Sequence, residues 1–264
     1  MVVGGVLVVV FAVALGGFVY LWSRSDAEPV GLADARRRFL EDRVADPGPD
    51  GPYTPPEGVY AYRGSGSESL SQPPKSQTEG PGIPGTVSHE AGGCWSFRLD
   101  YSTNHYRVWD LCADPSGLRE TGGTVFQRWD FVVSTIDTLE RTRCDPPAVV
   151  ISSTMTPGDR WESRCEGQNS AIDGTTVTET VHRFVGWDRV RVGDRTVDAM
   201  HLRDRGVVSD AQSGTEAFDL WITVDGLIVK GRQRIVVDSD SPIGNVTYTQ
   251  EGEFSLVRAT PEGS

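Results

Sequence analysis

The sequence predicts an all-β protein, a large and strongly curved antiparallel sheet or open barrel of about 12–14 strands, preceded by one N-terminal transmembrane helix. Three observations predict it. Short runs of alternating apolar and polar residues follow one another from Gly58 onward, separated by turn residues. Two cysteines flank a hairpin, and the chain starts with a long uncharged apolar run. Consecutive strands joined by short turns form antiparallel meanders, which must curl or close.

The apolar run covers residues 2–22, "VVGGVLVVVFAVALGGFVYLW", without a charged side chain. A helix of that length spans about 31 Å, enough to cross the hydrocarbon core of a bilayer. Tyr20 and Trp22 lie where interfacial aromatic residues are expected. No basic n-region and no small-residue cleavage site is apparent. We therefore predict a retained anchor in the lipid bilayer.

Four regions follow from composition. After the anchor, residues 23–56 read as a juxtamembrane stalk and a Pro/Gly linker, within which 31–44 could form about three helical turns. Residues 57–258 form the β domain, and 259–264 a disordered tail. The arginines at 36–38 favour a cytoplasmic location for the chain that follows the anchor, but acidic residues are interleaved with them.

The cysteine hairpin reads "GCWSFRLDYSTNHYRVWDLCADPSG". Folding it at residues 102–104 makes residues whose numbers sum to 206 face each other, so that Cys94 lies opposite Cys112. We predict a disulfide there and a second between Cys144 and Cys165, the latter joining a loop cysteine to a strand. Four cysteines allow three pairings, and free thiols or metal or redox chemistry are the alternatives.

Disulfides persist outside the cytosol. Together with the apolar run, they predict a single-pass protein of the cell membrane whose C-terminal domain lies on the extracytoplasmic side. The predicted cysteine pairing favours the extracytoplasmic side more strongly than the arginines at 36–38 favour the cytoplasm.

The same hairpin places four large apolar residues on one face. These are candidates for the lining of an apolar ligand cavity, with ordinary core packing as the alternative: Trp95, Phe97, Trp109 and Leu111. In the later hairpin "FDLWITVDGLIVK", inward-facing Leu220, Ile222 and Val224 would leave Trp221 as a candidate exposed or rim aromatic.

Catalytic and metal motifs are missing from the sequence. The four histidines form no zinc motif, and there is no G-x-S-x-G. We therefore expect no catalytic residue, no metal and no cofactor. The net charge of −12, with no basic stripe, argues against a nucleic-acid partner.

Several segments resemble a group of uncharacterised, membrane-anchored actinobacterial proteins over most of residues 55–258. They are "GVYAYRGSGSESL", the cysteine hairpin, "GWDRVRVGDRTVDAMHLR", and "DLWITVDGLIVK" ahead of "SPIGNV". The D-x-W…DGL ending is also similar to LolA/LolB-like lipoprotein-carrier domains. This second resemblance implies a curved antiparallel sheet around an apolar cavity. Neither resemblance implies catalytic residues.

The leading hypothesis is a non-enzymatic, membrane-tethered domain that binds an apolar or lipid-like ligand or an envelope protein. One alternative is a cell-wall hydrolase with a carboxylate pair, for which Asp100 and Asp110 are candidates. Another is a structural subunit of a membrane complex.

Overall fold

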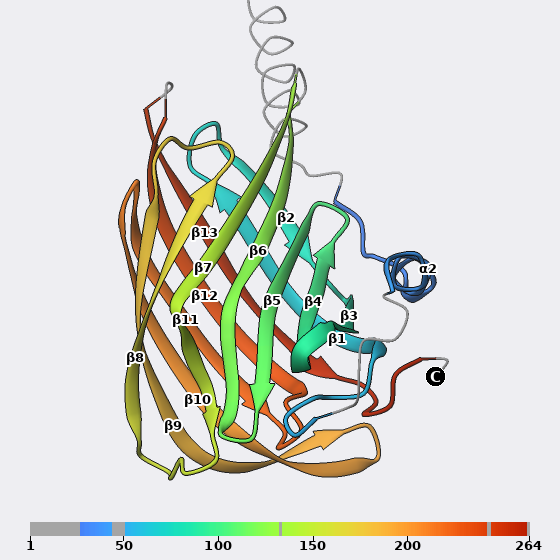
Figure 1. Ribbon diagram of the computed structural model, residues 1–264. Coiled ribbons are helices and arrows are strands. Elements are labelled where there is room, and N and C mark those ends of the chain that lie inside the picture. The colour runs from blue at the N-terminus through green and yellow to red at the C-terminus, as the bar shows by residue number, and fades with distance from the viewer. Residues whose placement is uncertain (1–26, 44–50, 132–133, 242–243, 263–264) are drawn as a thin grey trace, which may run out of the picture.

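The computed structural model describes residues 27–43, 51–131, 134–241 and 244–262. They form a β-barrel of tilted antiparallel strands, with one α-helix outside its wall (Figure 1). The elements are α2 (Leu32–Asp42), β1 (Gly58–Leu70), β2 (Lys75–Glu79), β3 (Gly82–His89), the short 3-10 helix η1 (Ala91–Gly93), β4 (Cys94–Ser102), β5 (His105–Asp114), β6 (Gly117–Phe131), β7 (Ser134–Ser152), β8 (Arg160–Asn169), β9 (Thr176–Val192), β10 (Arg195–Asp210), β11 (Gln212–Ile222), β12 (Ile228–Ser241) and β13 (Gly244–Leu256).

The barrel is closed. Strands β3 to β13 follow each other around the wall in sequence order, and β13 returns to pair with β1. The opposite edge of β1 is shared, because its first half pairs with β3 and its second half with β2. Twelve strands thus complete the circle and β2 is an additional one. The prediction of an all-β fold is confirmed, while the open sheet is corrected to a closed one, because β13 pairs with β1.

Both predicted disulfides are present. Cys94 lies opposite Cys112 with Cα atoms 3.9 Å apart, in the register that was expected. Cys144 and Cys165 lie opposite each other on β7 and β8, with Cα atoms 4.1 Å apart. The second bond therefore joins two strands and not a loop to a strand. The pairing was predicted correctly, but the strand register around it was not, because the two cysteines lie 21 residues apart in the sequence.

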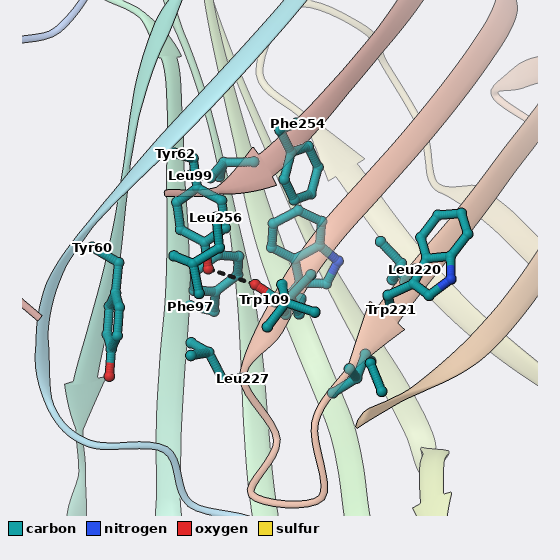
Figure 2. Packing of buried hydrophobic residues seen from close by; sticks show 14 of the residues in the cluster. Tyr60, Tyr62, Phe97, Leu99, Trp109, Leu220, Trp221, Leu227, Phe254 and Leu256 are labelled. Atoms are coloured by element: carbon teal, nitrogen blue, oxygen red, sulfur yellow. Dashed lines mark hydrogen bonds between the residues drawn. The ribbon is translucent and has the colours of Figure 1, made fainter. Parts of the chain in front are cut away.

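One end of the barrel is filled by aromatic side chains. Phe97 is 0% exposed and stacks on Trp109, with ring centroids 5.7 Å apart. Tyr62 donates a hydrogen bond to the carbonyl oxygen of Ile228. Its ring packs against Phe97 and Phe254, with ring centroids 5.9 Å apart in each pair (Figure 2). Leu227, at the β11–β12 turn, is buried in the same cluster. This end is a conventional hydrophobic core.

The N-terminal segment packs on the outside of the wall. Helix α2 lies next to β3 in Figure 1, and Ala35 packs with Val30 against Val59 of β1. Arg38 forms an ion pair of 2.6 Å with Asp100. The helical turns expected within residues 31–44 are present as α2.

Both ends of the β domain extend further than predicted. The last residues of the expected linker are fixed, since Tyr60 donates a hydrogen bond of 2.6 Å to the carbonyl oxygen of Pro56. At the other end, the amide of Glu262 donates to the carbonyl oxygen of Val59 at 2.7 Å. The tail predicted to be disordered over 259–264 is therefore ordered as far as Glu262, because it adds a backbone pair to β1.

The predicted anchor at residues 2–22 lies outside the described residues. Within the described ranges, no helix combines the length and the apolar character needed to cross a bilayer.

Candidate ligand cavity

Beyond the aromatic core, the barrel encloses a cavity of about 520 Å³. This volume lies within the usual range for small-molecule sites. The strands contribute inward-facing side chains of three kinds: large apolar groups, threonines and a few ionisable groups. The apolar part of the lining includes Trp129, Phe131, Trp161, Leu202, Leu220 and Ile235.

The four predicted cavity residues divide into two pairs. Trp109 and Leu111 of β5 line the cavity. Trp95 and Phe97 of β4 are 1% and 0% exposed and belong to the aromatic core. All four lie on the inner face, as the alternation predicts, but β4 runs alongside the filled end of the barrel.

Trp221 was predicted to be an exposed or rim aromatic, but it is buried. Only 7% of it is accessible, because its ring stacks on His201 with centroids 4.3 Å apart. The indole N–H donates to Asp188 Oδ2 at 2.8 Å, and Lys230 lies over the ring at 4.4 Å. The side chain of Trp221 points away from the cavity, as predicted, but polar groups on the outer surface cover it.

Its neighbours follow the predicted alternation only in part. Leu220 and Ile222 line the cavity. Val224 is 61% exposed, since it lies beyond the end of β11 in the turn. The alternation argument therefore applies to residues inside the strand and fails where the strand ends.

Ionisable side chains form a belt in the cavity wall. Arg107 makes no ion pair of 4.0 Å or less within the described part of the chain, and its buried Nε has no hydrogen-bond partner. Its guanidinium group lies 5.0 Å from the ring centre of Phe218. Glu140 and Glu216 are close enough to act electrostatically on Arg107. The belt therefore combines one cation with several carboxylates.

Glu120 belongs to this belt. Burial, reinforced by the charge of Asp204, raises the pKa of Glu120 from its ordinary 4.5 to about 7, although His182 and Arg107 act in the opposite direction. A carboxyl with that pKa exchanges its proton near neutral pH. The cavity therefore holds a group that can act as a hydrogen-bond donor or as a charge.

Replacing Glu120 by glutamine should stabilise the protein at alkaline pH. The folded state binds the proton of Glu120 more tightly than the unfolded chain, so this group stabilises folding below pH 4.5 and loses that effect as the pH rises through 7. Glutamine stays neutral throughout. The difference in free energy of unfolding between the variant and the wild type should therefore shift in favour of the variant as the pH rises. Between pH 5.5 and pH 8 we expect that shift to be about 2 kcal/mol.

Urea unfolding at the two pH values measures this difference. The matched control is Glu162→Gln, which makes the same substitution at an exposed position of β8 outside the cavity. An equal effect of both substitutions would contradict the assignment.

Three further cavity residues form a hydrogen-bonded chain across β8, β9 and β10. Ser163 Oγ lies 2.7 Å from His182 Nε2, and His182 Nδ1 lies 2.7 Å from Asp204 Oδ1. The ring of Trp161 stacks on His182 with centroids 5.4 Å apart and planes inclined by 11°. All four side chains line the cavity.

The sequence did not reveal this chain. Its members are 19 and 22 residues apart, so no local motif contains two of them. The sequence offers one indication, since alternation places each of the three residues on the inner face of its strand. This becomes useful only when the pairing register of the strands is known.

A second polar cluster is buried in the wall. His105 Nδ1 lies 3.2 Å from Glu79 and 3.3 Å from Glu68, and the three groups could hold a cation. Burial raises the pKa of Glu68, and His105 opposes that shift. The carboxylate of Glu79 leaves no space for side chains at Gly66 and Gly252, where a Cβ would lie 2.4 Å and 2.9 Å from Glu79 Oε2.

Amide and phenol donors already satisfy much of this cluster. Gln250 donates to Glu79 at 2.6 Å, and Gln127 and Tyr248 donate to Glu68 at 3.1 Å and 2.8 Å. We interpret it as a structural ion and hydrogen-bond network.

The two carboxylates named for a hydrolase do not meet across a cleft. Asp100 is paired with Arg38 and Arg98 at 2.6 Å and 2.8 Å. Asp110, on the neighbouring strand β5, lies opposite Ser96, whereas Asp100 of β4 lies opposite Tyr106, and neither carboxylate lines the cavity. The geometry therefore gives no support to Asp100 and Asp110 as the carboxylate pair of a hydrolase.

Comparisons with known proteins add little. No family model and no curated protein matches the chain, so neither supports the resemblance to actinobacterial proteins. Among solved structures, the crystal structure of the hypothetical lipoprotein YmcC from Escherichia coli (K12) matches at a TM-score of 0.38 and 11% identity, over 89% of this chain and 99% of that one. At this TM-score the match is too distant to support a conclusion about fold or function, and none is based on it.

Proposed function

We propose that the protein binds an amphipathic, lipid-like molecule inside its barrel. The observation that carries this proposal is the cavity of about 520 Å³, which has a mainly apolar wall and a belt of ionisable groups. Apolar walls favour a ligand with an acyl chain or ring system, since burying apolar surface gains about 25 cal/mol per Å². Arg107 and Glu120 offer a charge and a hydrogen-bond donor to the polar group of such a ligand.

We further propose that the barrel is held at the extracytoplasmic face of a membrane by residues 2–22. The two disulfides favour an oxidising compartment. The uncharged run at the N-terminus has the length of a membrane span. A domain in that position would meet lipid-like molecules at the surface of the bilayer.

Filling the cavity should abolish ligand binding. Thr180 lies on the cavity side of β9, and its neighbour Val181, 44% exposed, points outward. A tryptophan at position 180 would occupy space that the ligand needs, so Thr180→Trp should weaken binding of the fluorescent apolar probe N-phenyl-1-naphthylamine by at least about tenfold.

The control is Val181→Trp, which adds the same indole to the opposite face of the same strand. It should bind the probe within a factor of about two of the wild type. Equal binding by both variants, or no binding by the wild type, would overturn the proposal.

A further inference from the structure

We propose that Ser163, His182 and Asp204 form a nucleophilic triad that hydrolyses carboxylic esters of lipid-like molecules held in the cavity. The inference rests on the proposed function, because the substrate must enter the same cavity. It goes beyond that function by assigning a reaction, acyl transfer to water. It also departs from the expectation of a non-enzymatic domain.

The hydrogen-bond directions suit a serine nucleophile. An ionised Asp204 can only accept, so the hydrogen on the neutral imidazole lies on Nδ1 and points at Asp204 Oδ1, 2.7 Å away. This leaves Nε2 as an acceptor for the hydroxyl hydrogen of Ser163, at 2.7 Å. A base held in one tautomer by a carboxylate, and itself bonded to a hydroxyl, is the arrangement that activates serine.

The ring of His182 is held in place by Trp161. Trp161 stacks on its face, and the indole of Trp161 is in turn held by a hydrogen bond of 2.7 Å to the carbonyl oxygen of Val149. The His182 and Asp204 side chains are only 11% and 17% exposed. The base therefore keeps its orientation in a partly desolvated place that still opens to the cavity.

The reaction balances with water as the second substrate. Ser163 Oγ forms a bond to the ester carbonyl carbon while its proton passes to His182 Nε2. The bond from that carbon to the alcohol oxygen then breaks, and His182 returns the proton to the alcohol. Water attacks the acyl-serine in the same way, which releases the acid and restores the hydroxyl.

Two ionisable side chains that line the same cavity are the candidates to stabilise the transient oxyanion. Around His182, β9 pairs with both of its neighbouring strands, so its amides are occupied by ladder hydrogen bonds. We therefore assign the stabilisation to side chains. Arg107 carries a positive charge with an unpaired Nε. Glu120, which is near enough to respond to Asp204 and His182, can donate a hydrogen bond in its protonated form.

Covalent labelling of the full chain in detergent with a fluorophosphonate tests the nucleophile. The label should be found on Ser163 by peptide mass mapping, and the full chain should hydrolyse p-nitrophenyl octanoate faster than the acetate, because the longer chain buries more apolar surface. Ser163→Ala should lose both label and turnover. Asp204→Asn should lower kcat on the order of 10³–10⁴-fold.

The control is Ser209→Ala, on the exposed outer face of β10, which should keep label and turnover. Thermal melting of each variant shows whether it is folded. Failure to label Ser163 together with no hydrolysis above that of folded Ser163→Ala would overturn the triad. If the wild type then still binds N-phenyl-1-naphthylamine, the proposed ligand cavity stands without the reaction. If the wild type does not bind the probe, both proposals fail.

Discussion

Removing both disulfides should lower the free energy of unfolding by about 6 kcal/mol in total, which is a large part of the stability of a typical domain. The bonds close loops of 18 and 21 residues. In the chain-entropy description, a cross-link of that span stabilises by about 3 kcal/mol, mainly because it restricts the unfolded chain. The two bonds lie on different strand pairs, so their effects should add.

Urea unfolding of the variants Cys94→Ala/Cys112→Ala and Cys144→Ala/Cys165→Ala measures each contribution separately. The two double variants should lose similar amounts because the loops are similar in length. The wild type treated with a reductant provides the comparison without substitutions. A loss of less than about 1 kcal/mol in the fourfold variant would show that the barrel does not need its cystines, and would remove the main argument for an oxidising compartment.

Trp95→Ala should cost about 3–5 kcal/mol of stability. The side chain of Trp95 is 1% exposed, and its ring lies close to the backbone of Gly226 in the turn that covers the filled end of the barrel. Deleting it leaves a void between β4 and that turn, which the surrounding strands cannot close without losing their register. The cost therefore includes lost burial and the cavity left behind.

Trp187→Ala is the matched control, since Trp187 is 50% exposed and contacts Phe184 edge-on at the outer surface. It should cost no more than about 1 kcal/mol. Thermal and urea unfolding of both variants give the comparison. Similar losses for the two would contradict the placement of the core at the β4 end of the barrel.

The strand alternation was the most informative part of the sequence. It predicted the all-β class and the inward faces of β4, β5 and β11, so Trp109, Leu111 and Leu220 lie on the cavity side as expected. Trp221 was misjudged because alternation says which way a side chain leaves its strand and not what covers it there. The cover is supplied by His201 and Lys230 from neighbouring strands.

The candidate site was far less predictable. Ser163, His182 and Asp204 come together only because β8, β9 and β10 pair in one particular register, and a shift by a single residue would turn each of them to the other face. Glu120 is separated from all three in sequence, and its raised pKa reflects burial and, among other charges, those of Asp204 and His182. Neither the chain of hydrogen bonds nor the belt of ionisable side chains corresponds to a local pattern in the amino-acid sequence.

By itself, the sequence determined what depends on neighbours along the chain: the strands, their turns, and the hairpin that joins Cys94 to Cys112. Closure of the barrel, the space left inside it and the groups that meet there were decided by the tertiary structure alone. The physical reason is that pairing between β1 and β13, and the sum of registers around the wall, are contacts between residues far apart in the chain. No local energy specifies them until the whole circle is complete.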